Sequence, residues 1–219
     1  KTAYEIYQCD WSSDVCSSDL LLDERLDAVA LAARQVFAVR MVAGCVAAAL
    51  TAYLYGAAWG LGWLVAFAVV ESATRLFTRP VAAGQALTRR QRLAYLCSMF
   101  ATSCVWAALA VLYWIEGQEP FRLAAMAVLA GTMIHAQGFS FRSPAALAAL
   151  VAPPAALWFI LPVGFGGYHG PPLLALTVGL MMLLAYVTAS ARANMRTSKA
   201  LDRKSTRLNS SHTDISRMP

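Results

Sequence analysis

Few side chains in this chain of 219 residues combine the types and the spacing that chemistry requires. Glu71 and Arg75 stand four residues apart in a long apolar stretch, at the spacing of an intrahelical ion pair. His135 and Gln137 occupy a second apolar stretch, and Arg40 lies at the edge of a third. Ionisable groups are costly at membrane depth, so they are functional candidates there. If the three stretches are neighbours, these five side chains form one polar cluster.

A purely structural role is the alternative for the same residues. Arg40 and Arg75 can extend their charged ends to the lipid headgroups, and Arg75 can neutralise Glu71. A lone histidine such as His135 is commonly hydrogen-bonded at a helix interface, and a pH or ligand sensor is its functional alternative. The sequence leaves these alternatives open.

The chain contains none of the sequence motifs that mark a catalytic or cofactor site. It has no glycine-rich phosphate loop, no paired-cysteine metal spacing, no His-Glu pair at helical spacing and no nucleophile elbow. His135 and His169 are expected on opposite sides of the membrane, which argues against a shared haem. We therefore predict no cofactor, no metal site and no catalytic residue in this sequence.

The cysteines Cys45, Cys97 and Cys104 all lie in apolar stretches. Small buried thiols are expected there rather than disulfides. Cys97 and Cys104 are seven residues apart on one helix face, which is typical of small residues at a helix interface.

The composition excludes a water-soluble fold. Hydrophobic residues make up 59% of the chain and charged residues 14%, and the mean hydropathy is +0.54. Six apolar segments have the length that a helix needs to cross about 30 Å of hydrocarbon. They cover residues 38–55, 59–77, 93–114, 122–140, 145–163 and 172–191. We predict an all-α membrane protein with six transmembrane helices over residues 38–191, surrounded by the lipid bilayer and binding no nucleic acid.

The distribution of basic residues predicts the orientation, because cytoplasmic loops keep the excess of Lys and Arg. With the N-terminus inside, one side holds twelve of them: Arg25, Arg34, Arg40, Arg75, Arg79, Arg89, Arg90, Arg92, Arg142, Arg192, Arg196 and Lys199. The opposite side holds only Arg122. Both ends of the six-helix domain are therefore expected in the cytoplasm.

Aromatic residues give a second indication of orientation, because Trp and Tyr prefer the headgroup region. Eight of them fall at the expected non-cytoplasmic ends: Tyr53, Tyr55, Trp59, Trp63, Tyr113, Trp114, Trp158 and Tyr168. The aromatic belt and the charges agree.

The two ends differ in composition from everything between them. Residues 1–20 and 202–219 are polar and rich in Ser, Asp and Arg, and both resemble translated synthetic adapter DNA. The codons AAC-TCC-AGT-CAC encode residues 209–212, and their reverse complement in a shifted frame encodes residues 10–13. We therefore expect both ends to be adapter-derived and residues 21–201 to be an internal fragment of a longer reading frame.

Two further segments flank the spans. Residues 21–37 place apolar side chains at roughly helical spacing (Leu22, Leu26, Val29, Leu31 and Val36), which predicts a cytoplasmic amphipathic helix. A linker from an upstream domain is the alternative. Residues 181–201 contain no Gly or Pro. The last span is therefore predicted to continue unbroken into a cytoplasmic signalling helix over 192–201, with Arg192, Met195, Arg196 and Leu201 as its transmitting residues.

Pro153 and Pro154 fall near the middle of the fifth span. Two prolines remove backbone donors and clash with the preceding turn, so a kink is expected. Such kinks are tolerated where neighbours satisfy the freed carbonyls. Packing is the first interpretation of this pair, and a hinge for signal transfer is the alternative.

The exit segment ARANMRTSKAL, the stretch HAQGFSFRSPAALAALVAPPAAL and the six-span layout resemble the N-terminal sensor regions of bacterial hybrid sensor histidine kinases of the alphaproteobacterial type. The resemblance covers most of residues 21–201. It implies a place in the bacterial inner membrane, a homodimer formed through the downstream helix, and a response regulator reached through domains that follow. His135 and His169 do not match the phosphorylated-histidine motif, so no catalytic role passes to them.

The sequence therefore predicts a signal-input and anchoring module of a two-component histidine kinase, with no catalytic residues of its own. Similar membrane modules also precede diguanylate cyclases, which keeps that output as an alternative. A small multi-span permease or membrane enzyme is the alternative from another class. It would need a polar pathway across the bilayer, whereas the polar residues here gather toward one side.

Overall fold

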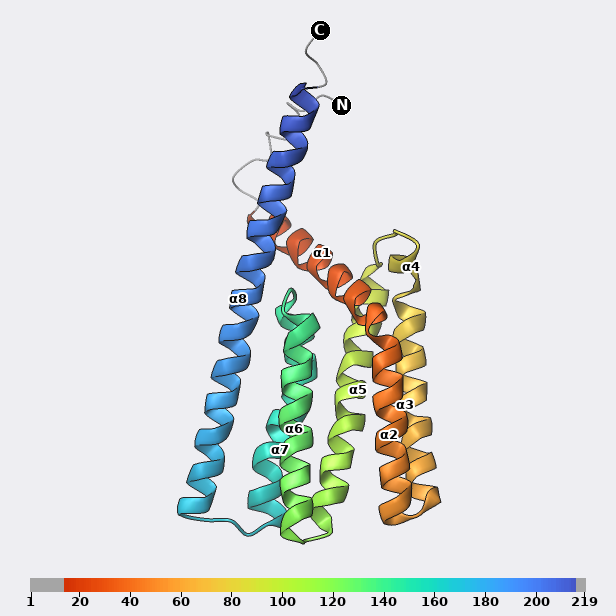
Figure 1. Cartoon of the computed structure of the whole chain (residues 1–219), viewed down its shortest axis with the longest axis vertical. Helices are drawn as coiled ribbons and strands as arrows, with labels where there is room; N and C mark the ends of the chain where they lie inside the picture. Colours follow the sequence, from red (N-terminus) through yellow and green to blue (C-terminus); the bar gives the residue numbers. More distant parts are fainter. Residues whose placement is uncertain (1–13, 216–219) are drawn as a thin grey trace. The chain divides into compact units, whose positions relative to one another are not determined.

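The computed structural model describes residues 14–215, with side chains for residues 25–198 and Ala200. The described residues form helices and no strands (Figure 1). In chain order the helices are α1 (Asp14–Gln35), α2 (Phe37–Tyr55), α3 (Ala57–Phe77), α4 (Arg79–Ala82), α5 (Arg89–Ile115), α6 (Glu119–Ser140), α7 (Pro144–Ile160), the π-helix η1 (Leu161–Phe165) and α8 (Pro171–Ile215). Residues 1–13 and 216–219, at the outer parts of the two adapter-like ends, lie outside the described residues.

Six of the described helical segments are long and apolar enough to cross a bilayer. They are Phe37–Tyr55, Ala57–Phe77, Arg89–Ile115, Glu119–Ser140, Pro144–Phe165 and Pro171–Ser198. Each one contains or nearly coincides with a segment predicted from the sequence. The all-α fold with six membrane-spanning helices is confirmed.

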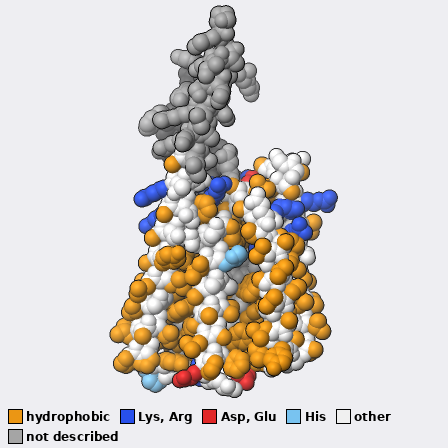
Figure 2. Space-filling model, viewed as in Figure 1, with side chains coloured by type: hydrophobic (Ala, Val, Ile, Leu, Met, Phe, Trp, Pro, Cys, Tyr) orange, Lys and Arg blue, Asp and Glu red, His pale blue; other side chains and the backbone are white. Residues whose placement is uncertain are grey.

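The surface of these helices is apolar, as lipid requires. Val46 of α2 is 64% exposed and Val65 of α3 is 62% exposed, positions that a water-soluble helix would fill with polar side chains. Figure 2 shows hydrophobic side chains covering the visible face of the helices between their ends. Exposed apolar surface on this scale marks contact with lipid.

The chain forms two compact units, the first up to Met99 and the second from Phe100 onward. In the first unit, α2 and α3 form a tight hairpin, which turns at Gly56 with a φ of 98°. A Cβ at Gly60 would meet Ala48 O and Ala52 Cβ, each at 2.5 Å, and a Cβ at Gly44 would overlap the Phe67 ring. Small residues let the two helices approach closely, which is how helices pack without a hydrophobic driving force.

Helix α1 precedes the hairpin and contacts both α2 and α4. Its buried side chains are Leu26, Val29, Ala30 and Ala33. Their spacing of three and four residues places them on one face of the helix. Leu31, which the sequence placed on the apolar face, is 45% exposed instead. It lies two residues from Val29 and therefore points to the other side of the helix.

The connection from α3 to α5 contains the short helix α4 and a proline. Pro80 lies in the first turn of the short helix α4. Thr88 and Gln91 then begin α5 with a capping box, because Thr88 N donates to Gln91 Oε1 at 2.9 Å and Gln91 N donates to Thr88 Oγ1 at 3.3 Å.

In the second unit, α6 packs against α7 and α8. Met133, Leu180 and Val187 form the buried centre of this packing. Leu147, Val151, Ala155, Trp158, Leu183 and Leu184 surround it. The Trp158 indole N–H donates to the Leu176 carbonyl at 2.9 Å, which adds a polar anchor between α7 and α8.

Helix α7 continues through Pro153 and Pro154 and changes to the π-helix η1 at Leu161. Pro154 has no N–H, so the carbonyl of Leu150, four residues earlier, loses its intrahelical donor. The Ser103 hydroxyl of α5 donates to that carbonyl at 2.6 Å, and Ser103 and Leu150 are both buried. Ser103 is thus the neighbour that the sequence argument required at the prolines.

The expectation of buried cysteines is wrong. Cys45, Cys97 and Cys104 are all free thiols on the exposed surface of their helices. Lipid is as apolar as the interior between helices, so a thiol has no strong preference for burial there.

Replacing Ser103 with Ala should destabilise the protein by about 1 kcal/mol, because the Leu150 carbonyl then has no donor in an apolar surrounding. Ser140→Ala is the matched control. The Ser140 hydroxyl bonds the Ala136 carbonyl, which keeps its own helical donor. Thermal unfolding in detergent micelles measures both.

A double-mutant cycle makes this test specific. Pro154→Ala restores the missing N–H, so the cost of Ser103→Ala should fall by at least half in that background. An unchanged cost would show that Ser103 acts through packing alone.

Candidate functional site

The first unit contains a buried ion pair between two spans. Arg40 near the start of α2 contacts Glu71 of α3, with 2.8 Å between the Arg40 guanidinium nitrogen and Glu71 Oε2. The Glu71 side chain is fully buried and that of Arg40 is 11% exposed. A charged pair held this far from water resists separation, because removing either partner leaves the other charge uncompensated.

Tyr95 of α5 completes this group, which we call the Glu71 cluster (Arg40, Glu71 and Tyr95). Tyr95 is fully buried, as is Glu71. The Tyr95 hydroxyl and Glu71 Oε1 have no hydrogen-bond partner among the described residues. Buried polar atoms are nearly always paired, so these two atoms mark a site of unusual polarity within the membrane.

Hydroxyl groups extend the polar region along α3. The Thr74 hydroxyl lies 3.0 Å from the Ser98 hydroxyl of α5. The Thr78 hydroxyl accepts a hydrogen bond from the Arg34 guanidinium at 3.3 Å. Asp27 of α1 accepts two hydrogen bonds from Arg92 of α5, at 2.9 and 3.1 Å. These contacts fasten α1, α3 and α5 to one another at one end of the unit.

Glu71 therefore has a different partner from the one that the i+4 spacing suggested. Arg75 is exposed, and its guanidinium carbon lies 3.9 Å from the centre of the Phe37 ring. The Arg75 carbonyl accepts a hydrogen bond from Arg34 at 2.9 Å. A partner on the facing helix can approach a buried carboxylate end-on, whereas a partner one turn along the same helix lies on the surface beside it.

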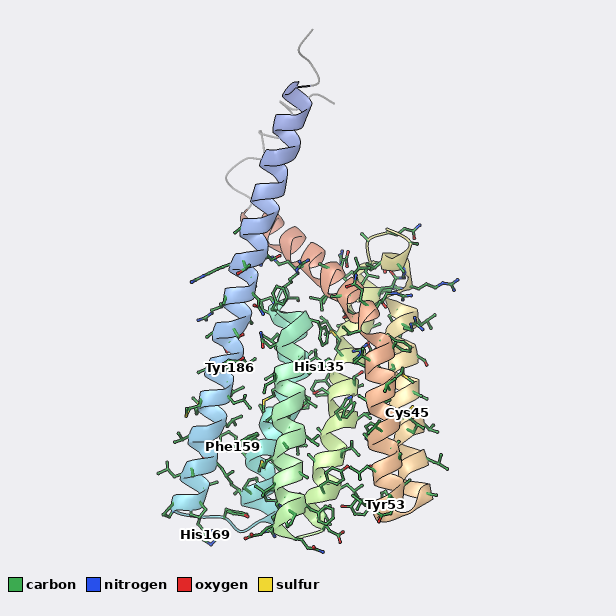
Figure 3. All side chains as sticks on the ribbon, viewed as in Figure 1. Cys45, Tyr53, His135, Phe159, His169 and Tyr186 are labelled. Atoms are coloured by element: carbon green, nitrogen blue, oxygen red, sulfur yellow. The ribbon has the colours of Figure 1, made fainter. Side chains whose placement is uncertain are left out.

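His135 and Gln137 belong to the second unit and have partners there. His135 is exposed on α6, with its ring 5.3 Å from the Phe139 ring. Figure 3 shows His135 far from His169 along the unit, in agreement with the prediction that the two histidines share no site. The buried Gln137 side chain donates to the Ser190 hydroxyl of α8 at 2.9 Å.

The exit helix is attached at a second point. Arg142, just beyond α6, donates to the Ser198 hydroxyl at 3.1 Å. Among the residues predicted to transmit a signal, Arg192 and Arg196 are exposed and Met195 is half-buried. The Leu201 side chain lies outside the described residues. Helix α8 is thus tied to Gln137 of α6 at Ser190 and to Arg142 at Ser198, and it remains helical through Leu201, after which the adapter-like residues begin.

Arg122 lies at the opposite end of the second unit, between two aromatic rings. Its guanidinium carbon lies 5.5 Å from the centre of the Trp114 ring and 5.8 Å from that of Tyr168. Trp114 and Tyr113 lie at the end of α5 and are buried within the protein. Packing against Arg122 and Phe121 accounts for their burial.

Sequence reasoning missed several of these residues. Tyr95 and Ser103 are ordinary polar residues within an apolar helix, and no spacing rule connects either of them to a partner on another helix. Arg122 was recognised only as the single basic residue of its side. The signal for it was available, because a lone arginine between Trp114 and Tyr168 in connecting segments fits a cation–π arrangement.

The described residues contain no group of three or more His, Cys, Asp or Glu side chains placed to hold a metal ion. A comparison of the chain with protein-family models, curated proteins and solved structures found no match. The arrangement of side chains is therefore the basis for any functional assignment.

Glu71→Gln should destabilise the protein by about 3 kcal/mol, because it leaves the Arg40 charge buried without a counter-ion. The double variant Arg40→Gln/Glu71→Gln should cost less than either single variant. Arg75→Gln is the control and should cost about 1 kcal/mol or less, since Arg75 is exposed on Phe37. Thermal unfolding in micelles measures the stability of each variant. Equal losses of stability in Arg40→Gln and Arg75→Gln would contradict the pairing of Arg40 with Glu71.

Proposed function

We propose that this chain is the signal-input and anchoring module of a bacterial sensor histidine kinase, lying in the inner membrane. The observation that supports it best is the unbroken course of α8 within the residues that we expect to be native: its apolar span Pro171–Ser198 has no break, and the helix continues through Leu201. A span that only anchors a protein can end at the headgroups. A span that transmits a signal has to remain rigid beyond them.

The length of α8 fits this role. Its apolar span, Pro171–Ser198, has 28 residues. At about 1.5 Å per residue it measures about 42 Å, which exceeds the hydrocarbon core of about 30 Å. The contacts at Ser190 and Ser198 lie in the last third of this span, so a shift of α6 moves the helix where it leaves the membrane.

The distribution of charge within each unit supports an orientation with both ends in the cytoplasm. In the first unit, the basic residues lie where α2 begins and α3 ends, and the α2–α3 turn at Gly56 carries no charge. In the second unit, Arg142, Arg192 and Arg196 lie where α6 ends and α8 leaves, opposite the acidic Glu116 and Glu119. Each unit thus has a single strongly basic end, as the positive-inside rule requires of a cytoplasmic face.

The proposed output is autophosphorylation by a dimer joined through the continuation of α8, followed by transfer to a response regulator. The coding DNA downstream of Leu201 tests this. A helix followed by a His-Glu-Leu-Arg-Thr-Pro-like sequence supports the kinase. A diguanylate cyclase sequence would keep the input role and replace the output, and an immediate stop codon would refute both.

The orientation predicts where reporter fusions are active. Alkaline phosphatase fused after Gly117 or Gly167 should be active in the periplasm, and green fluorescent protein fused after Gly84 should fluoresce in the cytoplasm. The same fusion points with exchanged reporters serve as controls. Inverted activity at any two of these points would refute the orientation.

The rigid-helix role predicts that output depends on helical phase. Inserting one or two residues between Ser198 and Leu201 in the full-length protein should lock phosphorylation on or off, because each residue turns the downstream surface by about 100°. This insertion point leaves both contacts of α8 to α6 in place. Inserting seven residues, which nearly restores the coiled-coil face, should recover regulation.

Two results would contradict this prediction. Phosphorylation that is indifferent to all the insertions would make the segment a flexible tether. Phosphorylation lost equally with one, two and seven residues would indicate local misfolding, which helix content measured by circular dichroism identifies.

A further inference from the structure

At the end of the second unit where α5 meets α6, three side chains form what we call the Arg122 cluster (Arg122, Trp114 and Tyr168). The Arg122 guanidinium lies over both aromatic rings, whose centres are 6.0 Å apart. One terminal nitrogen of Arg122 donates to the Tyr168 hydroxyl over a long 3.4 Å. Three separate segments of the chain thus converge on one cation.

The cluster has more donors than acceptors. Arg122 Nε and the Trp114 indole nitrogen are both buried, and neither has a hydrogen-bond partner among the described residues. The salt bridges of the described residues, Arg40–Glu71 and Arg92–Asp27, do not involve Arg122. Glu116 and Glu119 in the adjoining turn are exposed to solvent. Both unsatisfied atoms can only donate, so the group that would satisfy them is an acceptor.

The backbone places Tyr168 for this arrangement. The π-helix η1 ends at Phe165, and Tyr168 N donates to the Pro162 carbonyl at 3.1 Å. A Cβ at Gly166 would meet the Tyr168 ring at 2.5 Å, so only glycine leaves room for the ring to fold back. Gly167 follows with a φ of 62°, a conformation that glycine adopts without strain. The position of the Tyr168 ring is therefore fixed by the local backbone and by the two glycines before it.

Cation–π contacts do not satisfy these donors. They use the faces of the rings, whereas the N–H groups of a guanidinium point outward in its own plane. Buried donors without acceptors are costly, and a guanidinium without a counter-ion is more costly still. An arginine kept in this state is typical of a site that awaits an anion.

We propose that the Arg122 cluster binds an oxyanion, a carboxylate or phosphate group. The guanidinium of Arg122 donates two hydrogen bonds, to two oxygens of the anion or to one of them, and the Trp114 N–H donates a third. Two sources carry this chemistry: the headgroup of an anionic phospholipid and a soluble organic acid. The inference goes beyond the proposed function and does not depend on it, because the site belongs to the chain whatever output follows.

The test uses the purified chain with 5-fluorotryptophan in maltoside micelles, which contain no oxyanion. Fluorine NMR gives a signal for each tryptophan, and Trp114→Phe identifies that of Trp114. Benzoate is titrated as the soluble probe, and phosphatidylglycerol is added to the micelles as the lipid probe. We expect a saturable shift of the Trp114 signal with at least one of them, and the one that acts identifies the source.

Substitutions of Arg122 make the result specific. Arg122→Gln should weaken binding at least about tenfold, and Arg122→Lys, which keeps the charge and loses the fork, should weaken it less. Arg79→Gln, at an exposed arginine of α4, is the matched control and should leave the affinity unchanged. The signals of the other tryptophans report whether each variant is folded.

Thermal stability gives an independent readout. Without an oxyanion, Arg122→Gln should be at least as stable as the unsubstituted chain, because it removes an uncompensated charge. The active probe should then raise the melting temperature of the unsubstituted chain alone. A Trp114 signal that moves with neither probe, or moves equally in Arg122→Gln, overturns the proposal. So does a clear loss of stability in Arg122→Gln without an oxyanion, which would make Arg122 a structural cation.

Discussion

The interior of a bilayer has no water to satisfy a polar group, so each one within the spans needs a partner in the protein. Most of the specific contacts in this chain follow from that constraint. Arg40 forms an ion pair with Glu71, and the Ser103 hydroxyl donates to the carbonyl that Pro154 leaves without a donor. The Gln137 amide donates to the Ser190 hydroxyl. Apolar packing brings the helices together, and these polar pairs decide which helix faces which.

The same constraint explains what could be predicted from the sequence. The six spans were predictable, because length and hydropathy are properties of each segment alone. The unbroken course of α8 through Leu201 followed from the lack of Gly and Pro in residues 181–201. Pairing was harder. Glu71 could be identified as a buried carboxylate, but its partner Arg40 lies on another helix, and only the packing of α2 on α3 at Gly44 and Gly60 determines that choice.

One error in the sequence reasoning came from treating lipid as if it were water. The three cysteines were expected to be buried between helices and are exposed on the helix surfaces instead. A thiol is accommodated equally well by lipid and by a neighbouring helix, because both surroundings are apolar. Trp114 lies next to the end of α5, where the aromatic belt was predicted, and its ring is buried beside Arg122.

The bond from Ser103 to the Leu150 carbonyl has a consequence for how this protein can vary. Its acceptor is main chain, so any residue that packs can replace Leu150. The need for a hydroxyl at position 103 exists only while position 154 lacks an N–H. Among relatives, substitutions at positions 103 and 154 should therefore occur together, although their side chains share no hydrogen bond. The side chain at position 150 should vary independently of both. Positions 103 and 154 are thus coupled in evolution through the carbonyl oxygen of a third residue, Leu150.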